Sequence, residues 1–259
     1  MQSLRSRYFA HQCGRFALLL LILGAMLPSA AWSLQPNRLV FTIEPSNGSA
    51  GQTLAPIAVS VEDKFGNVIT SDNTSMIQLT LSSNTLSGTV IQTVVNGVAT
   101  FSDLSINAVG TGYTLTANST NVPPPPLVTA ISTPFDITAG PPVMLAFGQQ
   151  PTDTPAGQYV NPAVTVAVQD SGGNTVTTDS STVVTISMTL CGAPITLEAE
   201  TDSAGIATFP TLRLNTVATG VVLDATASGL AGTTSTTFSV TANADRIFFD
   251  GFDDPACTP

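Results

Sequence analysis

The side chains that most often carry out chemistry are scarce in this chain of 259 residues. Its single histidine is His11 and its single tryptophan is Trp32. Both lie within residues 1–33, which have the pattern of a removable leader. Without His11 the mature chain lacks the side chain most used as a general base, so Ser-His-Asp and Cys-His arrangements are excluded. We expect a protein that is not an enzyme and has no cofactor.

Carboxylates are the remaining candidates. Glu198 and Glu200 are two residues apart, which in a strand places both on one face. They indicate either a hydrolase that uses only carboxylates or the solvated edge of a strand. Acidic residues around Asp63, Asp170 and Asp250–Asp254 supply the oxygen ligands that Ca²⁺ prefers, but none has EF-hand spacing. Asp63 and Asp170 fit turns equally well, so calcium remains an alternative to having no metal.

Two cysteines remain after the leader is removed, namely Cys191 and Cys257. An even number in an oxidising compartment is compatible with a disulfide. This bond would attach the last residues of the chain to the segment around Cys191. The alternative is two free thiols.

Residues 1–33 are predicted to be a secretory signal peptide. A basic region is followed by the apolar run Phe16–Leu27, which is shorter than the roughly 20 residues that a membrane span needs. Ala31 and Ser33 favour cleavage before Leu34, while cleavage after Ala31 and an uncleaved anchor are the alternatives. We expect no transmembrane span in the mature chain and a secreted, extracellular or outer-surface location.

The mature chain is strongly acidic. Residues 1–33 contain three of the seven Lys and Arg residues and none of the 17 Asp and Glu residues, which leaves four cations and a net charge of −13. So few cations cannot neutralise a run of phosphates, and we expect no nucleic acid partner. The charge is also explained by solubility alone.

Residues 38–242 contain an internal sequence repeat of two copies. Asp63–Asn67 returns as Asp170–Asn174, and Asn96–Phe101 returns as Ala204–Phe209. A repeat of about 100 residues with strand-like alternation corresponds to one β-sandwich per copy. The predicted fold is all-β: two tandem immunoglobulin-like β-sandwiches over residues 38–139 (repeat one) and 143–242 (repeat two), after a cleaved signal peptide. Residues 140–142 are the linker, and residues 243–259 are a C-terminal tail.

Local signals support strands and turns. Val59–Glu62 and Ile77–Leu81 alternate apolar and polar residues, as half-buried strands do. Asn96-Gly97 is a strong signal for a two-residue hairpin. Tyr113–Ala117 is expected to be one of the closing strands, and about seven strands are expected in each repeat. The stiff linker predicts a monomeric rod.

The motifs resemble a known family. Val59–Asn67 with Asn96–Leu104, and Val166–Asn174 with Gly205–Leu212, resemble bacterial immunoglobulin-like (Big) domains of the invasin and intimin type. The resemblance implies a secreted or cell-surface module with a structural or adhesive role, and it implies no particular ligand. The partner is therefore an unknown protein or glycan surface. The alternative function is an accessory module that binds polysaccharide or an exported partner.

The tail matches neither repeat. It resembles the Ile-Phe-x-Asp-Gly-Phe-Glu ending of secreted gammaproteobacterial proteins, which implies a Gram-negative source. The residues that carry this resemblance are Ile247, Phe248, Asp250, Gly251 and Phe252. Clustered phenylalanines form an exposed apolar patch unless they dock. A sorting or anchoring signal and a strand packed on repeat two both remain open.

Overall fold

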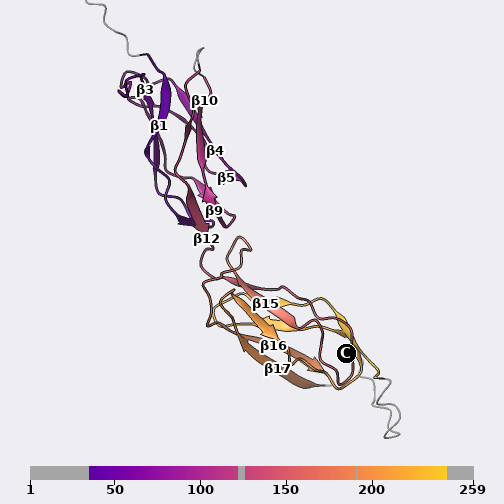
Figure 1. Ribbon diagram of the computed structural model, residues 1–259. Coiled ribbons are helices and arrows are strands. Elements are labelled where there is room, and N and C mark those ends of the chain that lie inside the picture. The colour runs from indigo at the N-terminus through magenta and orange to yellow at the C-terminus, as the bar shows by residue number, and fades with distance from the viewer. Residues whose placement is uncertain (1–34, 122–125, 191, 244–259) are drawn as a thin grey trace, which may run out of the picture. The chain divides into compact units, whose positions relative to one another are not determined.

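The computed structural model describes residues 35–121, 126–190 and 192–243 (Figure 1). These residues form strands, turns and loops, and none of them is helical. This part of the chain is therefore all-β, as its composition and alternation predict. Within the described ranges, no helix is long and apolar enough to cross a membrane.

Repeat one contains short strands that belong to several small sheets. The strands are β1 (Arg38–Ile43), β2 (Gly48–Ser49), β3 (Ile57–Glu62), β4 (Met76–Leu81), β5 (Leu86–Ser87), β6 (Ile91–Thr93), β7 (Val98–Phe101), β8 (Ser105–Ile106), β9 (Gly110–Tyr113), β10 (Leu115–Ser119), β11 (Ala130–Ile131) and β12 (Phe135–Thr138). The sheet orders are β1-β3-β7, β11-β10-β4-β6 and β2-β12-β9, with β5 paired to β8.

Repeat two follows the same plan. Its strands are β13 (Met144–Phe147), β14 (Thr154–Pro155), β15 (Val164–Gln169), β16 (Val183–Leu190), β17 (Ala193–Glu200), β18 (Ile206–Phe209), β19 (Ala218–Val221), β20 (Asp224–Thr226), β21 (Thr233–Thr234) and β22 (Phe238–Thr241). They form sheets β13-β15-β18, β14-β22-β19 and β17-β16-β20-β21. The long strands β16 and β17 lie side by side in Figure 1.

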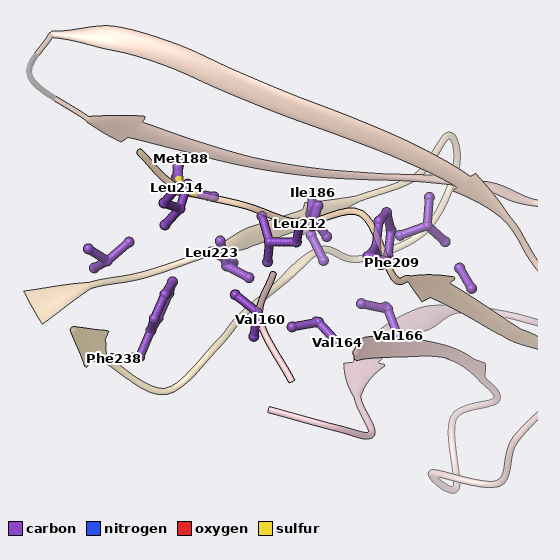
Figure 2. Packing of buried hydrophobic residues seen from close by; sticks show 14 of the residues in the cluster. Val160, Val164, Val166, Ile186, Met188, Phe209, Leu212, Leu214, Leu223 and Phe238 are labelled. Carbon is purple, nitrogen blue, oxygen red and sulfur yellow. The ribbon is translucent and has the colours of Figure 1, made fainter. Parts of the chain in front are cut away.

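The buried apolar residues fall into two clusters that share no residue, one from Leu39 to Ile137 and one from Leu145 to Val240. Corresponding residues of the sequence repeat fill them: Phe101 is 1% exposed and its counterpart Phe209 is 2% exposed. Figure 2 shows Phe209 packed with Val166 and Ile186, which come from different sheets. Aliphatic residues and two or three phenylalanines fill each cluster, and neither cluster contains the tryptophan and cysteines that form the core of antibody domains.

One edge strand in each repeat, β1 or β13, is hydrogen-bonded to a segment that leads into another sheet. In repeat one the Leu39 N–H donates to the Val128 carbonyl at 2.9 Å. In repeat two the Leu145 N–H donates to the Ala231 carbonyl at 3.0 Å. An unpaired edge strand is a template for pairing with another chain, so these bonds protect β1 and β13.

The predicted two-residue turn at Asn96-Gly97 is confirmed, but the strands that flank it, β6 and β7, belong to different sheets, and one predicted strand is wrong. Val95 and Val98 bridge around Asn96 and Gly97, whose φ values are 51° and 79°. Tyr113–Ala117, expected to be one strand, is broken at Thr114: β9 pairs with β12, whereas β10 pairs with β4 in another sheet.

The number of strands also differs from the prediction of about seven in each repeat. Repeat one has twelve described strands and repeat two has ten, because several two-residue ladders such as β2, β5 and β8 complete the sheets. Such short pieces leave too little alternation to be read from sequence.

Candidate functional site

The aspartates of the repeated turn use their carboxylates on their own backbone. Asp63 Oδ1 accepts the N–H groups of Phe65 at 2.8 Å and Asn67 at 2.9 Å. The Asn67 side-chain amide donates to Asp63 Oδ2 at 3.0 Å. Asp170 makes the same bonds with Gly172 and Asn174. Both aspartates therefore act as turn residues, because an aspartate can replace the backbone acceptor in a tight turn.

Asp170 has an additional partner in the predicted linker. The Gly140 N–H donates to Asp170 Oδ2 at 2.9 Å. Asp170 is only 1% exposed. A Cβ at Gly140 would lie 3.0 Å from the Ala50 carbonyl oxygen and 3.5 Å from Asp170 Oδ2, so glycine fits this crowded position.

These hydrogen bonds lower the pKa of both carboxyls. The Asn67 side-chain amide is the largest cause that holds the pKa of Asp63 below its ordinary value. Burial by itself would raise the pKa of Asp170, but the bonds from Asn174, Gly140 and Gly172 outweigh it and the pKa is lowered. A carboxylate that accepts several N–H groups is favoured in its charged form. The bonds stabilise the turns.

Glu198 and Glu200 lie on one face of β17, as their spacing predicts, and both are exposed. The hydroxyl of Thr185 is 3.4 Å from Glu198 Oε1. Asp202, which follows them, accepts the N–H groups of Ala204 and Ile206 and is a turn residue. The arrangement is that of a solvated strand followed by a turn.

A second pair of aspartates shows where the repeats differ in chemistry. In repeat two, Asp179 Oδ1 accepts the Thr201 hydroxyl at 2.6 Å and Asp179 Oδ2 accepts the Thr182 hydroxyl at 2.7 Å. In repeat one the corresponding aspartate is Asp72, and valine replaces the threonine at Val94. Asp72 Oδ2 is buried without a hydrogen-bond partner.

Metal binding would require several such groups to converge. Within the described ranges, no group of three or more His, Cys, Asp or Glu side chains is placed to hold a metal ion. Asp63 and Asp170, which are counterparts in the repeat, each bond their own turn. Asp250–Asp254 lie outside the described residues.

The two tyrosines of the mature chain have different environments. Tyr113 is 3% exposed, its ring packs near Phe135, and its hydroxyl accepts the Asn84 side-chain amide at 2.7 Å. Tyr159 is 56% exposed, and the Arg213 guanidinium lies 5.6 Å from its ring centroid. Tyr159 is therefore the tyrosine whose ring is available to a ligand.

Several large apolar side chains are exposed in repeat one, and sequence analysis did not identify them. Phe65 is 71% exposed at the tip of the Asp63–Asn67 turn, with the Lys64 ammonium 4.8 Å from its ring centroid. Val95 is 66% exposed beside the hairpin. Repeat two has the small residues Ser171 and Gly172 in the corresponding turn. The sequence signal that could have identified the exposed Phe65 is the replacement of Lys64-Phe65 by Ser171-Gly172 in the second copy.

Comparisons with known proteins find no matching family model and no matching curated protein. Among solved structures, the D00-D0 domain of intimin is 13% identical, with a TM-score of 0.39, and the match covers 79% of this chain and 98% of that one. Fibronectin(III)-like modules of Clostridium thermocellum CbhA are 13% identical, with a TM-score of 0.23 and coverage of 83% and 99%.

A biofilm-associated protein BSP domain is 19% identical, with a TM-score of 0.25, over 78% of this chain and 29% of that chain. The chain spans 25% of a matched β-glycosidase from Bacteroides vulgatus, at 11% identity over 80% of this chain and a TM-score of 0.31. These scores are low, and the all-β architecture rests on the strand pairing of this chain itself.

The remaining predicted site residues lie outside the described residues. They are Cys191 and Cys257 of the predicted disulfide, and Ile247, Phe248, Asp250, Gly251 and Phe252 of the tail. The predicted signal peptide lies outside them as well.

Proposed function

We propose that the mature chain is a non-catalytic, secreted or cell-surface module made of two immunoglobulin-like β-sandwiches, with a structural or adhesive role. The observation that carries this proposal is the pair of separate cores built from corresponding residues of the repeat. Two successive copies of one fold suit a spacer or display unit on the outside of the cell.

The use of the polar side chains supports a role without catalysis. Asp63, Asp170 and Asp202 each bond their own turn. Glu198 and Glu200 are both exposed on one face of β17. A catalytic carboxylate pair needs two groups that converge on one substrate in different environments.

Localisation is the first test. Culture medium, outer membrane and cytoplasm are separated, and the intact mass of the protein is measured in each fraction. The proposal expects a chain that begins at Leu34, or at Trp32 after the alternative cleavage, in the medium or the outer membrane. A full-length chain confined to the cytoplasm contradicts it.

Adhesion is the second test. The purified mature protein is assayed on immobilised host and bacterial surfaces, and cells with and without the gene are compared for attachment and aggregation. A structural or adhesive role expects a change in at least one of these measurements. The proposal is rejected if binding, attachment and aggregation are all unchanged and the protein is absent from the cell surface.

The pair Tyr159 and Arg213 favours one alternative, an accessory module that binds polysaccharide. An exposed aromatic ring can stack on a sugar, and the neighbouring guanidinium can donate hydrogen bonds to its hydroxyls. A glycan array with the parent protein and Tyr159→Ala tests this function. Binding that is lost in the variant supports it, and no binding by the parent rejects it.

A further inference from the structure

Repeat two displays one aromatic ring beside one cation. Tyr159 is 56% exposed, and the Arg213 guanidinium lies over its ring at 5.6 Å from the ring centroid. Arg213 is itself exposed, and the backbones of the two residues form an antiparallel bridge. We call these two side chains the Tyr–Arg platform. A guanidinium over an aromatic ring is an attractive arrangement, so each side chain limits the motion of the other.

Paired backbone holds the platform in place. The Val160 N–H donates to the Leu212 carbonyl at 2.9 Å, and the Gly157 N–H donates to the Leu214 carbonyl at 2.7 Å. Val160, Leu212 and Leu214 are buried in the core of repeat two. The platform therefore stands on a well-packed part of the fold, which lowers the entropy cost of binding a ligand.

Repeat one contains the same bridge with small polar residues. Thr53 corresponds to Tyr159 and Ser105 to Arg213, and Thr53 and Ser105 also form an antiparallel bridge. The flanking backbone hydrogen bonds recur as well, at 2.8 Å and 2.9 Å. The fold therefore accepts a threonine and a serine at this bridge, and folding does not explain the tyrosine and the arginine. Both positions of one bridge differ together between the two copies.

The charge of Arg213 has no carboxylate partner among the described residues. Arg213 is the only lysine or arginine in residues 143–190 and 192–243. The one ion pair in the described part of the chain joins Arg38 to Glu62 in repeat one. None of the described carboxylates of repeat two therefore pairs with Arg213, and its guanidinium is available to a ligand.

A sugar that carries a carboxylate suits both parts of the platform. The planar guanidinium matches a carboxylate through two parallel N–H···O bonds, and such charge-assisted bonds are about twice as strong as neutral ones. The exposed Tyr159 ring supplies an apolar surface with a polar hydroxyl at its end, which suits the mixed surface of a sugar. A neutral sugar would use the tyrosine but would leave the charge of Arg213 unpaired.

We propose that the Tyr–Arg platform of repeat two binds polysaccharides that contain uronic acids, the sugars that carry a carboxylate. Arg213 binds the carboxylate, and the Tyr159 ring contacts the face of the sugar. This inference rests on the proposed function of a module outside the cell, and it names the class of sugar that the polysaccharide-binding alternative leaves open.

The net charge of −13 opposes an anionic ligand only at long range. At 0.15 M ionic strength the screening length is about 8 Å, so exposed carboxylates farther away than this act weakly on the ligand. A carboxylate in contact with Arg213 is much closer to the guanidinium than this length and keeps most of its attraction. Binding is therefore expected at physiological salt.

Matched acidic and neutral forms of the same polysaccharide test the proposal on the intact mature chain. The probes are oligomers of galacturonic, glucuronic and mannuronic acid, each compared with its methyl ester, in which the carboxylate is blocked and the rest of the sugar is unchanged. Calorimetric titration at physiological salt measures Kd for each pair. The proposal expects at least one acid to bind about 10- to 100-fold more tightly than its ester, because the ester loses charge-assisted bonds to one arginine.

The variants Arg213→Ser and Tyr159→Thr introduce the residues of the counterpart bridge, which the fold of repeat one accepts, and a thermal melt checks that both variants fold. Arg213→Ser should remove the preference for the acid, and Tyr159→Thr should weaken the binding of both forms. The matched control is Lys64→Ser, which removes an exposed cation of repeat one and changes the net charge by the same amount. It must leave the preference unchanged.

The outcomes separate this inference from the proposed function. Equal affinity for acids and esters, or a loss in Lys64→Ser as large as that in Arg213→Ser, rejects the role of the carboxylate. If esters and acids bind equally and Tyr159→Thr weakens both, the polysaccharide-binding alternative stands without the inference. Absence of binding to every acid also rejects the inference, and the structural or adhesive role is then decided separately by the localisation and attachment tests.

Discussion

Exchanging one buried side chain between the repeats tests the energetic reasoning most sharply. Asp179 accepts hydrogen bonds from the hydroxyls of Thr201 and Thr182. Its counterpart Asp72 has an unpartnered Oδ2, and Val94 occupies the position that corresponds to Thr201. The exchange variants are Thr201→Val in repeat two and Val94→Thr in repeat one. Valine and threonine have nearly the same shape, so the hydroxyl is the quantity that changes.

The hydrogen bonds determine the size and sign of the expected change in the free energy of unfolding. The 2.6 Å bond from Thr201 to Asp179 involves a charged acceptor, and losing a bond of this kind costs about 1.5–3 kcal/mol. Thr201→Val should therefore lower the free energy of unfolding of repeat two by that amount. In repeat two the Thr201 hydroxyl bonds Asp179 Oδ1, so Val94→Thr places a hydroxyl beside the corresponding Asp72 Oδ1 and should stabilise repeat one by about 0.5–1.5 kcal/mol.

Calorimetry of the mature protein measures both effects. For a domain of about 100 residues, 1 kcal/mol moves Tm by about 4–8 °C. Thr201→Ser is the control, because it keeps the hydroxyl and should retain most of the stability. A neutral Thr201→Val, or a destabilising Val94→Thr, would refute the assignment of these aspartates.

Two further predictions concern the turns. Since hydrogen bonds lower the pKa of Asp63 and Asp170 in the folded state, their stabilisation is complete above about pH 4–5 and is lost as the pH falls through the folded pKa; urea titrations between pH 2.5 and 6 should show this loss, and it should be smaller in Asp170→Asn. Gly205 has φ of 73°, and an added Cβ would lie 2.4 Å from the Val176 carbonyl oxygen, so Gly205→Ala should cost more than about 1–3 kcal/mol. Gly229→Ala, at φ of 77° in open space, should cost only about 1 kcal/mol in the same denaturation assay.

Sequence alone predicted the features that depend on local chemistry. Asn96-Gly97 and the Asp63–Asn67 turn were identified because each requires particular residues for its backbone. The break at Thr114 could not be seen, because Tyr113, Leu115 and Ala117 all point into one core although they belong to different sheets. The alternation of buried and exposed residues therefore continues through Thr114, where the chain passes from one sheet to another, and gives no sign of the break.

The exposed surface was predicted less well than the fold. A strand pattern shows which side chains are buried, but it does not show that the exposed Ile43 and Ile131 lie where β1 meets residues 127–133, because these segments are far apart in sequence. Matching Ile131 with its counterpart Thr234 in repeat two likewise requires the strand register.

The central claim is that the chain has two independent cores, and calorimetry of two variants tests it most directly. Phe101 and Phe209 are each almost fully buried, one in each cluster, and Phe→Ala in a core costs about 3–5 kcal/mol. The account predicts two unfolding transitions, of which Phe101→Ala lowers or removes one and Phe209→Ala the other. A single transition that both variants shift equally would contradict it.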